Sequence, residues 1–173
     1  MNLYNSSLYI EDLIRTIKNY PYLKEFENHS VFLTGSTGLI GSAVADILLY
    51  YSQLKGGSVK VYVAGRDKKK TEDRFSRYCD KSFFEYVKYD ACKDNELNFS
   101  ADYIIHCASN AYPSVIQKSP VETMNANFFG MLKLLEFAKK CSAAKTVFVS
   151  SSEIYGKKEK DAPFKETEYG YVD

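Results

Sequence analysis

The sequence lacks tryptophan altogether, and it has only two histidines and four cysteines in 173 residues. No two cysteines form a C-x-x-C pair, so neither the spacing of zinc ligands nor a disulfide framework is indicated. We therefore predict no metal site, and we expect reduced thiols in a cytoplasmic protein. The four cysteines are Cys79, Cys92, Cys107 and Cys141.

An excess of charge of either sign is also missing, because 23 basic residues balance 22 acidic ones. This balance gives no electrostatic reason to expect binding to nucleic acid or to an anionic membrane surface. No apolar run approaches the roughly 20 residues that a membrane-spanning helix needs. The first residues contain no compact apolar segment of the kind found in signal peptides.

Segments with the two periodicities of regular structure alternate along the chain. Short apolar runs without alternation predict strands that are buried on both faces, as in a parallel sheet. Strands are predicted at residues 31–34, 59–64, 83–89, 102–107 and 146–149, and helices at 8–20, 39–51, 67–79 and 120–140. The alternation predicts an α/β fold, with a doubly wound parallel sheet in the strand order 3-2-1-4-5.

The strongest local signal is a glycine-rich turn between the first predicted strand and the helix that follows it. Gly35 permits a tight turn, Gly38 lets the backbone approach a diphosphate, and Gly41 lets the helix pack close to the strand. The free N–H groups at the start of the helix would then bind the phosphates. The turn predicts a Rossmann-type dinucleotide site formed by Gly35, Ser36, Thr37, Gly38, Leu39, Ile40 and Gly41.

Five motifs in order resemble those of the extended short-chain dehydrogenase/reductase family. The first is the T-G-x-x-G-x-x-G turn, and the resemblance runs from about Ser30 to Gly156. The others are Asp90-Ala91, His106-Cys107-Ala108-Ser109, Pro120 with Asn127-Phe128-Phe129-Gly130, and Ser150-Ser151-Ser152-Glu153-Ile154-Tyr155-Gly156. The resemblance implies an enzyme that modifies nucleotide sugars. It is compatible with a homodimer but does not decide the oligomeric state. It also implies a place for Asp90 near the adenine, and cofactor contacts from Ala91, Cys107, Ala108, Ser109, Asn127 and Ser150.

The choice between NAD and NADP is left open by the end of the second predicted strand. An acid there binds the ribose hydroxyls of NAD, whereas an arginine accommodates the 2′-phosphate of NADP. The expected acid position is Gly65, and Arg66 follows it, which favours NADP. However, Arg66 could instead stack on the adenine, and Asp67 could bind the ribose if the strand ended later. Enzymes that keep their cofactor through an internal redox cycle mostly use NAD.

The catalytic segment of the family resembles residues 151–156, where Ser151 matches the catalytic Ser/Thr and Glu153 the acid before the tyrosine. Sugar-nucleotide 4,6-dehydratases have Thr-Asp-Glu there, so the acid for elimination is missing here. UDP-glucuronate decarboxylases, with Thr-Ser-Glu-Val-Tyr-Gly, are more similar, and residues 164–170 also resemble their next motif. A 4-epimerase fits nearly as well, since oxidation and re-reduction at C4 need no elimination acid.

No Tyr-x-x-x-Lys pair follows Ser151, and the pairs Tyr20/Lys24 and Tyr51/Lys55 lie before the first strand and at the end of the first long helix. We divide the chain into an N-terminal helical extension (1–29), a dinucleotide-binding domain (30–156) and the start of a connection to an absent substrate-binding region (157–173). We expect a truncated or incomplete product that binds dinucleotide but converts no sugar nucleotide. The alternatives are a dinucleotide-sensing regulatory module and an NADP-dependent sugar-nucleotide reductase.

Overall fold

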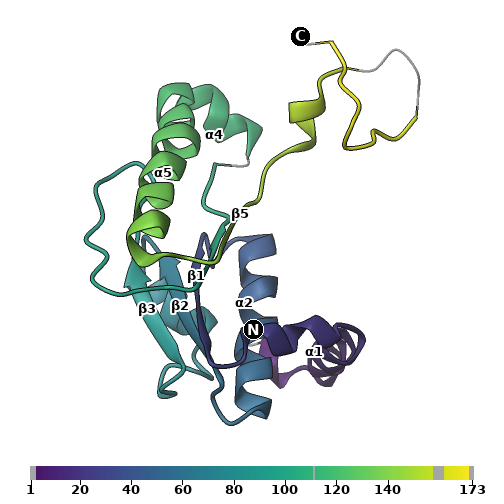
Figure 1. The fold of residues 1–173 in the computed structure, drawn as a ribbon, viewed down its shortest axis with the longest axis vertical. Helices are drawn as coiled ribbons and strands as arrows, with labels where there is room; N and C mark the ends of the chain where they lie inside the picture. Colours follow the sequence, from purple (N-terminus) through teal and green to yellow (C-terminus); the bar gives the residue numbers. More distant parts are fainter. Residues whose placement is uncertain (1–2, 111, 158–161, 172–173) are drawn as a thin grey trace.

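The computed structural model describes residues 3–110, 112–157 and 162–171, and its centre is a parallel sheet of five strands (Figure 1). The strands are β1 (His29–Thr34), β2 (Val59–Gly65), β3 (Phe84–Lys88), β4 (Tyr103–His106) and β5 (Lys145–Phe148). Their order in the sheet is β3-β2-β1-β4-β5, so the predicted doubly wound order is confirmed. Thr34 pairs with Ala64 on one side and His106 on the other, which brings three strand ends to one edge.

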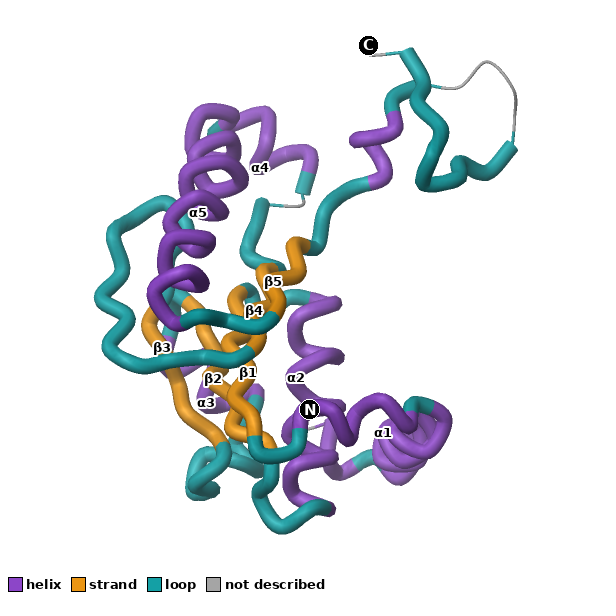
Figure 2. Tube along the Cα trace, in the orientation of Figure 1, coloured by secondary structure: helices purple, strands orange, loops and turns teal. Residues whose placement is uncertain are grey.

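Helices cover both faces of this sheet (Figure 2). The helices α1 (Ser7–Asn19), α2 (Leu39–Leu54) and α3 (Lys68–Arg74) precede β3, whereas α4 (Pro113–Lys118) and α5 (Pro120–Cys141) lie between β4 and β5. Because side chains alternate along a strand, Val31 and Leu33 of β1 pack with α2, while Phe32 packs with α5. The predicted arrangement with helices on both faces is therefore also confirmed.

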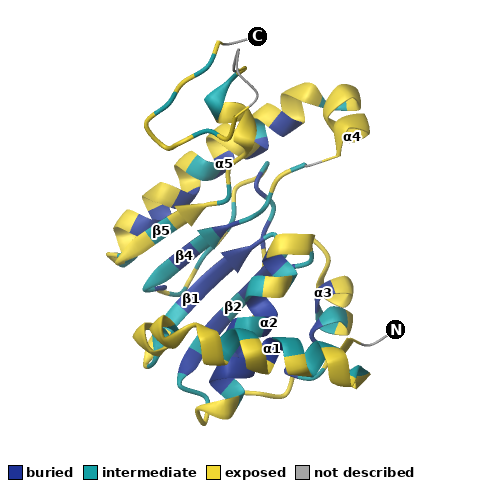
Figure 3. Ribbon diagram, turned by 90° about the vertical axis from the view of Figure 1, so that its right-hand side faces the viewer, coloured by how far each residue is buried: buried dark blue, intermediate teal, exposed yellow. Residues whose placement is uncertain are grey.

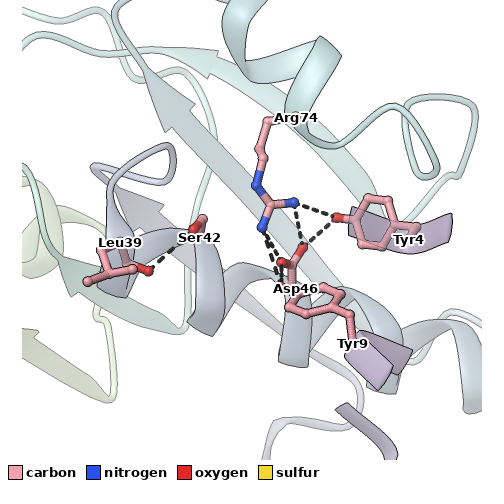
Figure 4. A network of polar contacts seen from close by, with 6 residues as sticks. All are labelled: Tyr4, Tyr9, Leu39, Ser42, Asp46 and Arg74. Atoms are coloured by element: carbon pink, nitrogen blue, oxygen red, sulfur yellow. Dashed lines mark hydrogen bonds and ion pairs between the residues drawn. The ribbon is translucent and has the colours of Figure 1, made fainter. Parts of the chain in front are cut away.

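The N-terminal segment is fixed to the domain by a buried polar cluster (Figure 4). A short 3-10 helix (Leu3–Asn5) precedes α1, and a second one (Pro21–Phe26) connects α1 to β1. The carboxylate of Asp46, on α2, is completely buried and accepts hydrogen bonds from the hydroxyl groups of Tyr4 and Tyr9. Arg74, at the end of α3, forms an ion pair with the same carboxylate. One buried charge thus joins the N-terminal segment, α2 and α3.

The observed helices differ from the prediction in two places. The helix expected over 67–79 ends at Arg74, because the chain turns inward there to bury Phe75 and Tyr78 completely. The short helix α4 was not predicted at all. It begins at Pro113, and proline suits the first turn of a helix. The helix has only six residues, which are too few to show a helical periodicity in the sequence.

The apolar side chains of α5 divide between two faces. One set of apolar residues, among them Ala126, Leu134 and Phe137, is buried against the sheet. The expected face of 124, 128, 131, 132, 135 and 138 is mostly exposed, with Met124 and Phe128 more than 60% accessible. Across the described residues, no helix combines the length and apolar character needed to cross a bilayer.

Candidate cofactor cleft

The turn between β1 and α2 has a backbone that only glycine allows. Gly35 has a φ angle of +67°, and a Cβ atom there would lie 2.5 Å from the carbonyl carbon and oxygen of Cys107. A Cβ atom on Gly41 would lie 2.3 Å from the carbonyl oxygen of Gly35. The two glycines therefore let the turn pack against the end of β4 and against the first turn of α2.

The first turn of α2 leaves backbone N–H groups available for a ligand. Gly38 is the N-cap residue and offers no side chain to bond them. Gly38 is exposed, and a Cβ atom there would meet only the carbonyl oxygen of Gly35, at 3.3 Å. A helix start with free amides and no projecting side chain fits a diphosphate, so these residues suit the cofactor that the sequence predicts.

A cleft of about 260 Å³ opens beside this turn. Nine of the residues predicted to bind cofactor line it: Gly35, Thr37, Gly38, Arg66, Asp90, Ala91, Cys107, Ala108 and Ser109. The sequence analysis singled out Gly65, which also lines the cleft, as the position of the ribose-binding acid, and it missed seven further lining residues: Lys70, Tyr89, Cys92, Asn110, Tyr112, Glu122 and Ala126. Tyr89 directly follows β3 and Ala126 is buried on α5, so the predicted topology could have indicated these two.

The remaining predicted cofactor residues do not line the cleft. Ser36 is buried within the turn, where its hydroxyl group donates to the carbonyl oxygen of Ala64 at 2.9 Å. The side chains of Leu39 and Ile40 are exposed, so only their backbone can serve a ligand at the helix start. Gly41 packs inside the turn, and Asp67 caps α3 by accepting a hydrogen bond from the backbone N–H of Lys70 at 2.9 Å.

The motifs after β3 and β4 meet α5 at the wall of the cleft. Ser109 donates a hydrogen bond to the side-chain oxygen of Asn127, on α5, at 2.6 Å. A Cβ atom on Gly130 would lie 2.7 Å from the carbonyl oxygen of Ala91, so a glycine is needed for α5 to approach this wall. The side chain of Asp90 accepts from the backbone N–H of Cys92 at 3.1 Å and thereby fixes the turn. The asparagine and the glycine of the N-x-x-G motif, Asn127 and Gly130, thus hold α5 against the loops after β4 and β3.

Three titratable side chains at the ends of β3 and β4 are neutral, of which Tyr89 and Cys107 line the cleft and His106 does not. His106 is completely buried and lies 2.6 Å from the Thr34 hydroxyl group through Nδ1, and burial lowers the pKa of its ring to about 4. Burial also raises the pKa of the Cys107 thiol, and it raises the pKa of the Tyr89 hydroxyl group to about 12. None of these three side chains is therefore charged at neutral pH, which suits Tyr89 and Cys107 to packing against a ligand rather than to acid–base chemistry.

The predicted catalytic residues lie outside the cleft, on the segment that follows β5. Ser151 accepts a hydrogen bond from the backbone N–H of Glu153 at 3.2 Å, and both residues are exposed. Ser150, directly before them, is exposed as well and does not line the cleft. In Figure 1 this segment leaves the sheet and leads to the C-terminal part of the chain.

The last described residues fold back onto the Ser151–Gly156 segment. The backbone N–H of Gly170 donates to the carbonyl oxygen of Tyr155 at 2.7 Å, and Lys157 and Tyr171 form an antiparallel bridge. The Tyr155 ring stacks on Phe164 with centroids 5.3 Å apart. The two stretches that the sequence marks as similar to decarboxylase motifs therefore pack on each other.

A family model confirms what these motifs suggest. The model of the NAD dependent epimerase/dehydratase family matches residues 31–171, which include all five motifs. The chain belongs to this family. Its fold and motifs are accordingly those of a nucleotide-sugar epimerase or decarboxylase domain.

Curated relatives include several decarboxylases. The chain is 30% identical to UDP-glucuronic acid decarboxylase 1 of Xenopus tropicalis over 170 residues, which cover 94% of this chain and 37% of the relative. It is 31% identical to UDP-glucuronic acid decarboxylase 1 of Arabidopsis thaliana over 145 residues, covering 82% and 30%. The chain thus spans about a third of the length of these two relatives.

Solved structures of epimerases share the fold. The UDP-N-acetylglucosamine 4-epimerase from Methanobrevibacter ruminantium M1 superposes with a TM-score of 0.67 at 23% identity, covering 84% of this chain and 45% of that one. A UDP-glucose-4-epimerase from Stenotrophomonas maltophila, solved with bound NAD, gives a TM-score of 0.59 at 20% identity, covering 82% and 42%.

Proposed function

We propose that this chain is the cofactor-binding part of an enzyme that oxidises and then re-reduces C4 of a nucleotide sugar. The single observation that carries the proposal is the uncapped start of α2, with Gly35 and Gly38 beside a cleft of about 260 Å³. A bound nicotinamide dinucleotide would accept a hydride from C4 of the sugar and later return it. The chain's own contribution is to hold the diphosphate at the helix start and to enclose the adenosine half between β2, the Asp90–Cys92 turn and α5.

Among the reactions of the family, decarboxylation and 4-epimerisation fit these residues best. Neither reaction needs the elimination acid, whose position is taken by Ser152. The similarity to UDP-glucuronic acid decarboxylases supports the first reaction and a UDP-sugar as substrate. In both reactions we assign Ser151 a hydrogen bond to the sugar hydroxyl group at C4, and Glu153 a role in orienting the sugar.

The 173-residue polypeptide itself is proposed to bind dinucleotide without converting a sugar. The sequence has three Tyr-x-x-x-Lys pairs, and two of them, Tyr20–Lys24 and Tyr51–Lys55, contribute nothing to the cleft, while the third is Tyr89–Lys93. Tyr20 ends α1 and is exposed, while the hydroxyl group of Tyr51 is engaged by the carboxylate of Glu27. Tyr89, which does line the cleft, has a pKa of about 12 and is a poor base at neutral pH.

We also propose a cytoplasmic homodimer. The four cysteines are free thiols, which suits a reducing compartment. The exposed side chains of Met124 and Phe128 on α5 form the kind of apolar surface that a second subunit covers.

Calorimetric titration of the purified chain with NAD and NADP tests the proposed function. We expect the wild type to bind at least one dinucleotide, and Gly38→Val to weaken binding by about tenfold or more, because the new side chain displaces phosphate from the amides. Ser76→Val is the matched control, since it adds the same side chain at an exposed position remote from the cleft. If neither dinucleotide binds the folded wild type, the proposal is wrong. Turnover of UDP-glucuronate by the 173-residue chain would contradict its assignment as a binding part only.

A further inference from the structure

The N-terminal segment, residues 3–26, is docked on the domain with few buried side chains. Tyr4 and Leu13 are the only buried residues in it. Its helix α1 packs against α2, while outward side chains such as Leu8 and Ile14 are exposed. A segment with so little buried apolar surface separates from the domain more readily than the sheet unfolds. Its polar contacts therefore contribute much of what keeps it docked.

These polar contacts converge on the ion pair between Asp46 and Arg74 (Figure 4). The Asp46 carboxylate accepts hydrogen bonds from the hydroxyl groups of Tyr4 and Tyr9. Arg74 donates to the same two hydroxyl oxygens, at 3.2 Å and 3.4 Å. Burial raises the pKa of both hydroxyl groups, and the Asp46 carboxylate raises it further, so both remain protonated donors. Each tyrosine thus contacts both members of the ion pair.

The docked segment keeps water away from this ion pair. Asp46 is completely buried, although the side chain of Arg74 is 21% exposed. The Tyr4 ring packs edge-on against Tyr78, with centroids 5.4 Å apart. The guanidinium groups of Arg74 and Arg77 lie 5.7 Å and 5.8 Å from the centroid of the same ring. If the segment separated from the domain, water would reach the carboxylate, and an ion pair exposed to water is much weaker than a buried one.

The ion pair joins the two helices that border the cofactor cleft. Asp46 lies about two turns beyond Gly38, the N-cap residue of α2. Arg74 ends α3, and Lys70, one turn earlier on that helix, lies on the rim of the cleft. Because α3 has only seven residues, its position depends on such contacts rather than on its own stability. The spacing between the start of α2 and this rim therefore depends on the ion pair.

We propose that Tyr4 and Tyr9 are positioning residues for the cofactor site, so that docking of the N-terminal segment and dinucleotide binding favour each other. This inference rests on the proposed function, because the ligand concerned is the dinucleotide in the cleft. The docked segment keeps the ion pair dry, and the pair holds α3 beside α2 at the spacing that the ligand needs. A ligand that binds the docked form more tightly must also stabilise the docking by the same factor.

Titration of NAD and NADP against the double variant Tyr4→Phe/Tyr9→Phe tests the coupling. The variant keeps both rings and removes only the two hydroxyl groups, and we expect it to bind dinucleotide about fivefold or more weakly than the wild type. Tyr51→Phe is the matched control. It removes a hydroxyl group that also bonds a carboxylate, that of Glu27, but this pair does not involve α3. Its affinity should stay within about twofold of the wild type.

Hydrogen exchange measures the other side of the coupling in the wild type, without any variant. Saturating dinucleotide should slow exchange of the backbone amides of α1 by about fivefold or more, at times too short for global unfolding. The double variant without ligand should exchange these amides faster than the wild type. A purely structural role for the tyrosines would lower stability but leave both the affinity and the effect of ligand on α1 unchanged.

Two results would overturn the coupling. One is unchanged exchange of α1 when the wild type is saturated with dinucleotide. The other is full affinity in a double variant whose α1 amides exchange faster than those of the wild type. Failure of both dinucleotides to bind the folded wild type would instead contradict the proposed function, and this inference with it.

Discussion

The two halves of the sheet differ in how completely they are covered. In the first half, the last four residues of β1 are buried, and α2 contributes eight buried residues. In the second half, Val147 and Phe148 at the end of β5 are exposed, as is the outer face of α5 (Figure 3). The first half completes its own core, whereas the second half buries only the side of α5 that packs on the sheet. Substitutions should therefore cost most in the first half.

The largest expected effect comes from the buried ion pair of the first half. Asp46→Ala should lower the free energy of unfolding by about 3–5 kcal/mol, because Arg74 and two tyrosine hydroxyl groups lose their shared partner. Asp94→Ala is the counterpart in the second half, where a carboxylate 96% exposed pairs with Lys133 at 2.6 Å. Its removal should have little effect on the free energy of unfolding, because solvent screens an exposed ion pair. Urea denaturation measures both, and equal losses would refute the contrast.

A pair of leucines tests the same difference for apolar packing. Leu49, on α2, is completely buried, and Leu49→Ala should cost about 2–5 kcal/mol through lost burial and a cavity. Leu135, on α5, is 46% exposed, and Leu135→Ala should change stability by less than about 1 kcal/mol. Thermal and urea unfolding of both variants measure these losses. A loss of unfolding free energy above this limit in Leu135→Ala would mean that the outer face of α5 is covered in solution.

The buried side chain of His106, at the end of β4, should make the free energy of unfolding depend on pH. The pKa of His106 is about 4 in the folded protein, below the ordinary value of 6.5, so the unfolded chain binds the proton first as the pH falls. The stability should be complete above pH 6.5 and should decrease by about 3 kcal/mol in total down to pH 4. Urea denaturation from pH 7.5 to 4 checks this slope. His106→Asn should flatten it, and an unchanged slope in that variant would show that other groups cause it.

The smallest expected change concerns the contact between α5 and the cleft wall. Gly130→Ala should cost about 1–3 kcal/mol, because its Cβ atom would lie 2.7 Å from the carbonyl oxygen of Ala91. Glu136→Ala, an exposed change on the same helix, should stay within about 0.5 kcal/mol. The displaced wall should also weaken dinucleotide binding. A Gly130→Ala variant as stable as the wild type would show that α5 shifts freely.

The sequence was sufficient for the strand order and the glycine turn, because strand runs and glycine spacing are local patterns. It could not show which face of α5 would be buried. Periodicity groups Met124, Phe128 and Leu135 on one face, but the face against the sheet is selected by Gly130, which lets the backbone approach. The capping role of Asp67 and the place of Lys70 on the rim depend on where β2 ends. A single sequence does not fix the last residue of a strand, so it does not separate these roles.

The pairing of Asp46 with Arg74 was also beyond the sequence. The two residues are 28 positions apart, and neither belongs to a motif. Tyr4 joins the pair from a segment with no periodic signal. Such contacts depend on the packing of three helices, which a single sequence does not specify.

The close approach of Gly35 to Cys107 has a consequence for assembly. The loop that receives the phosphates takes its shape only when the fourth strand has docked beside the first, some seventy positions later in the chain. An isolated β1–α2–β2 unit would therefore be a poor receptor for the ligand. A bound dinucleotide would in turn stabilise the pairing of β1 with β4, because a ligand that binds only the paired state shifts the equilibrium towards it.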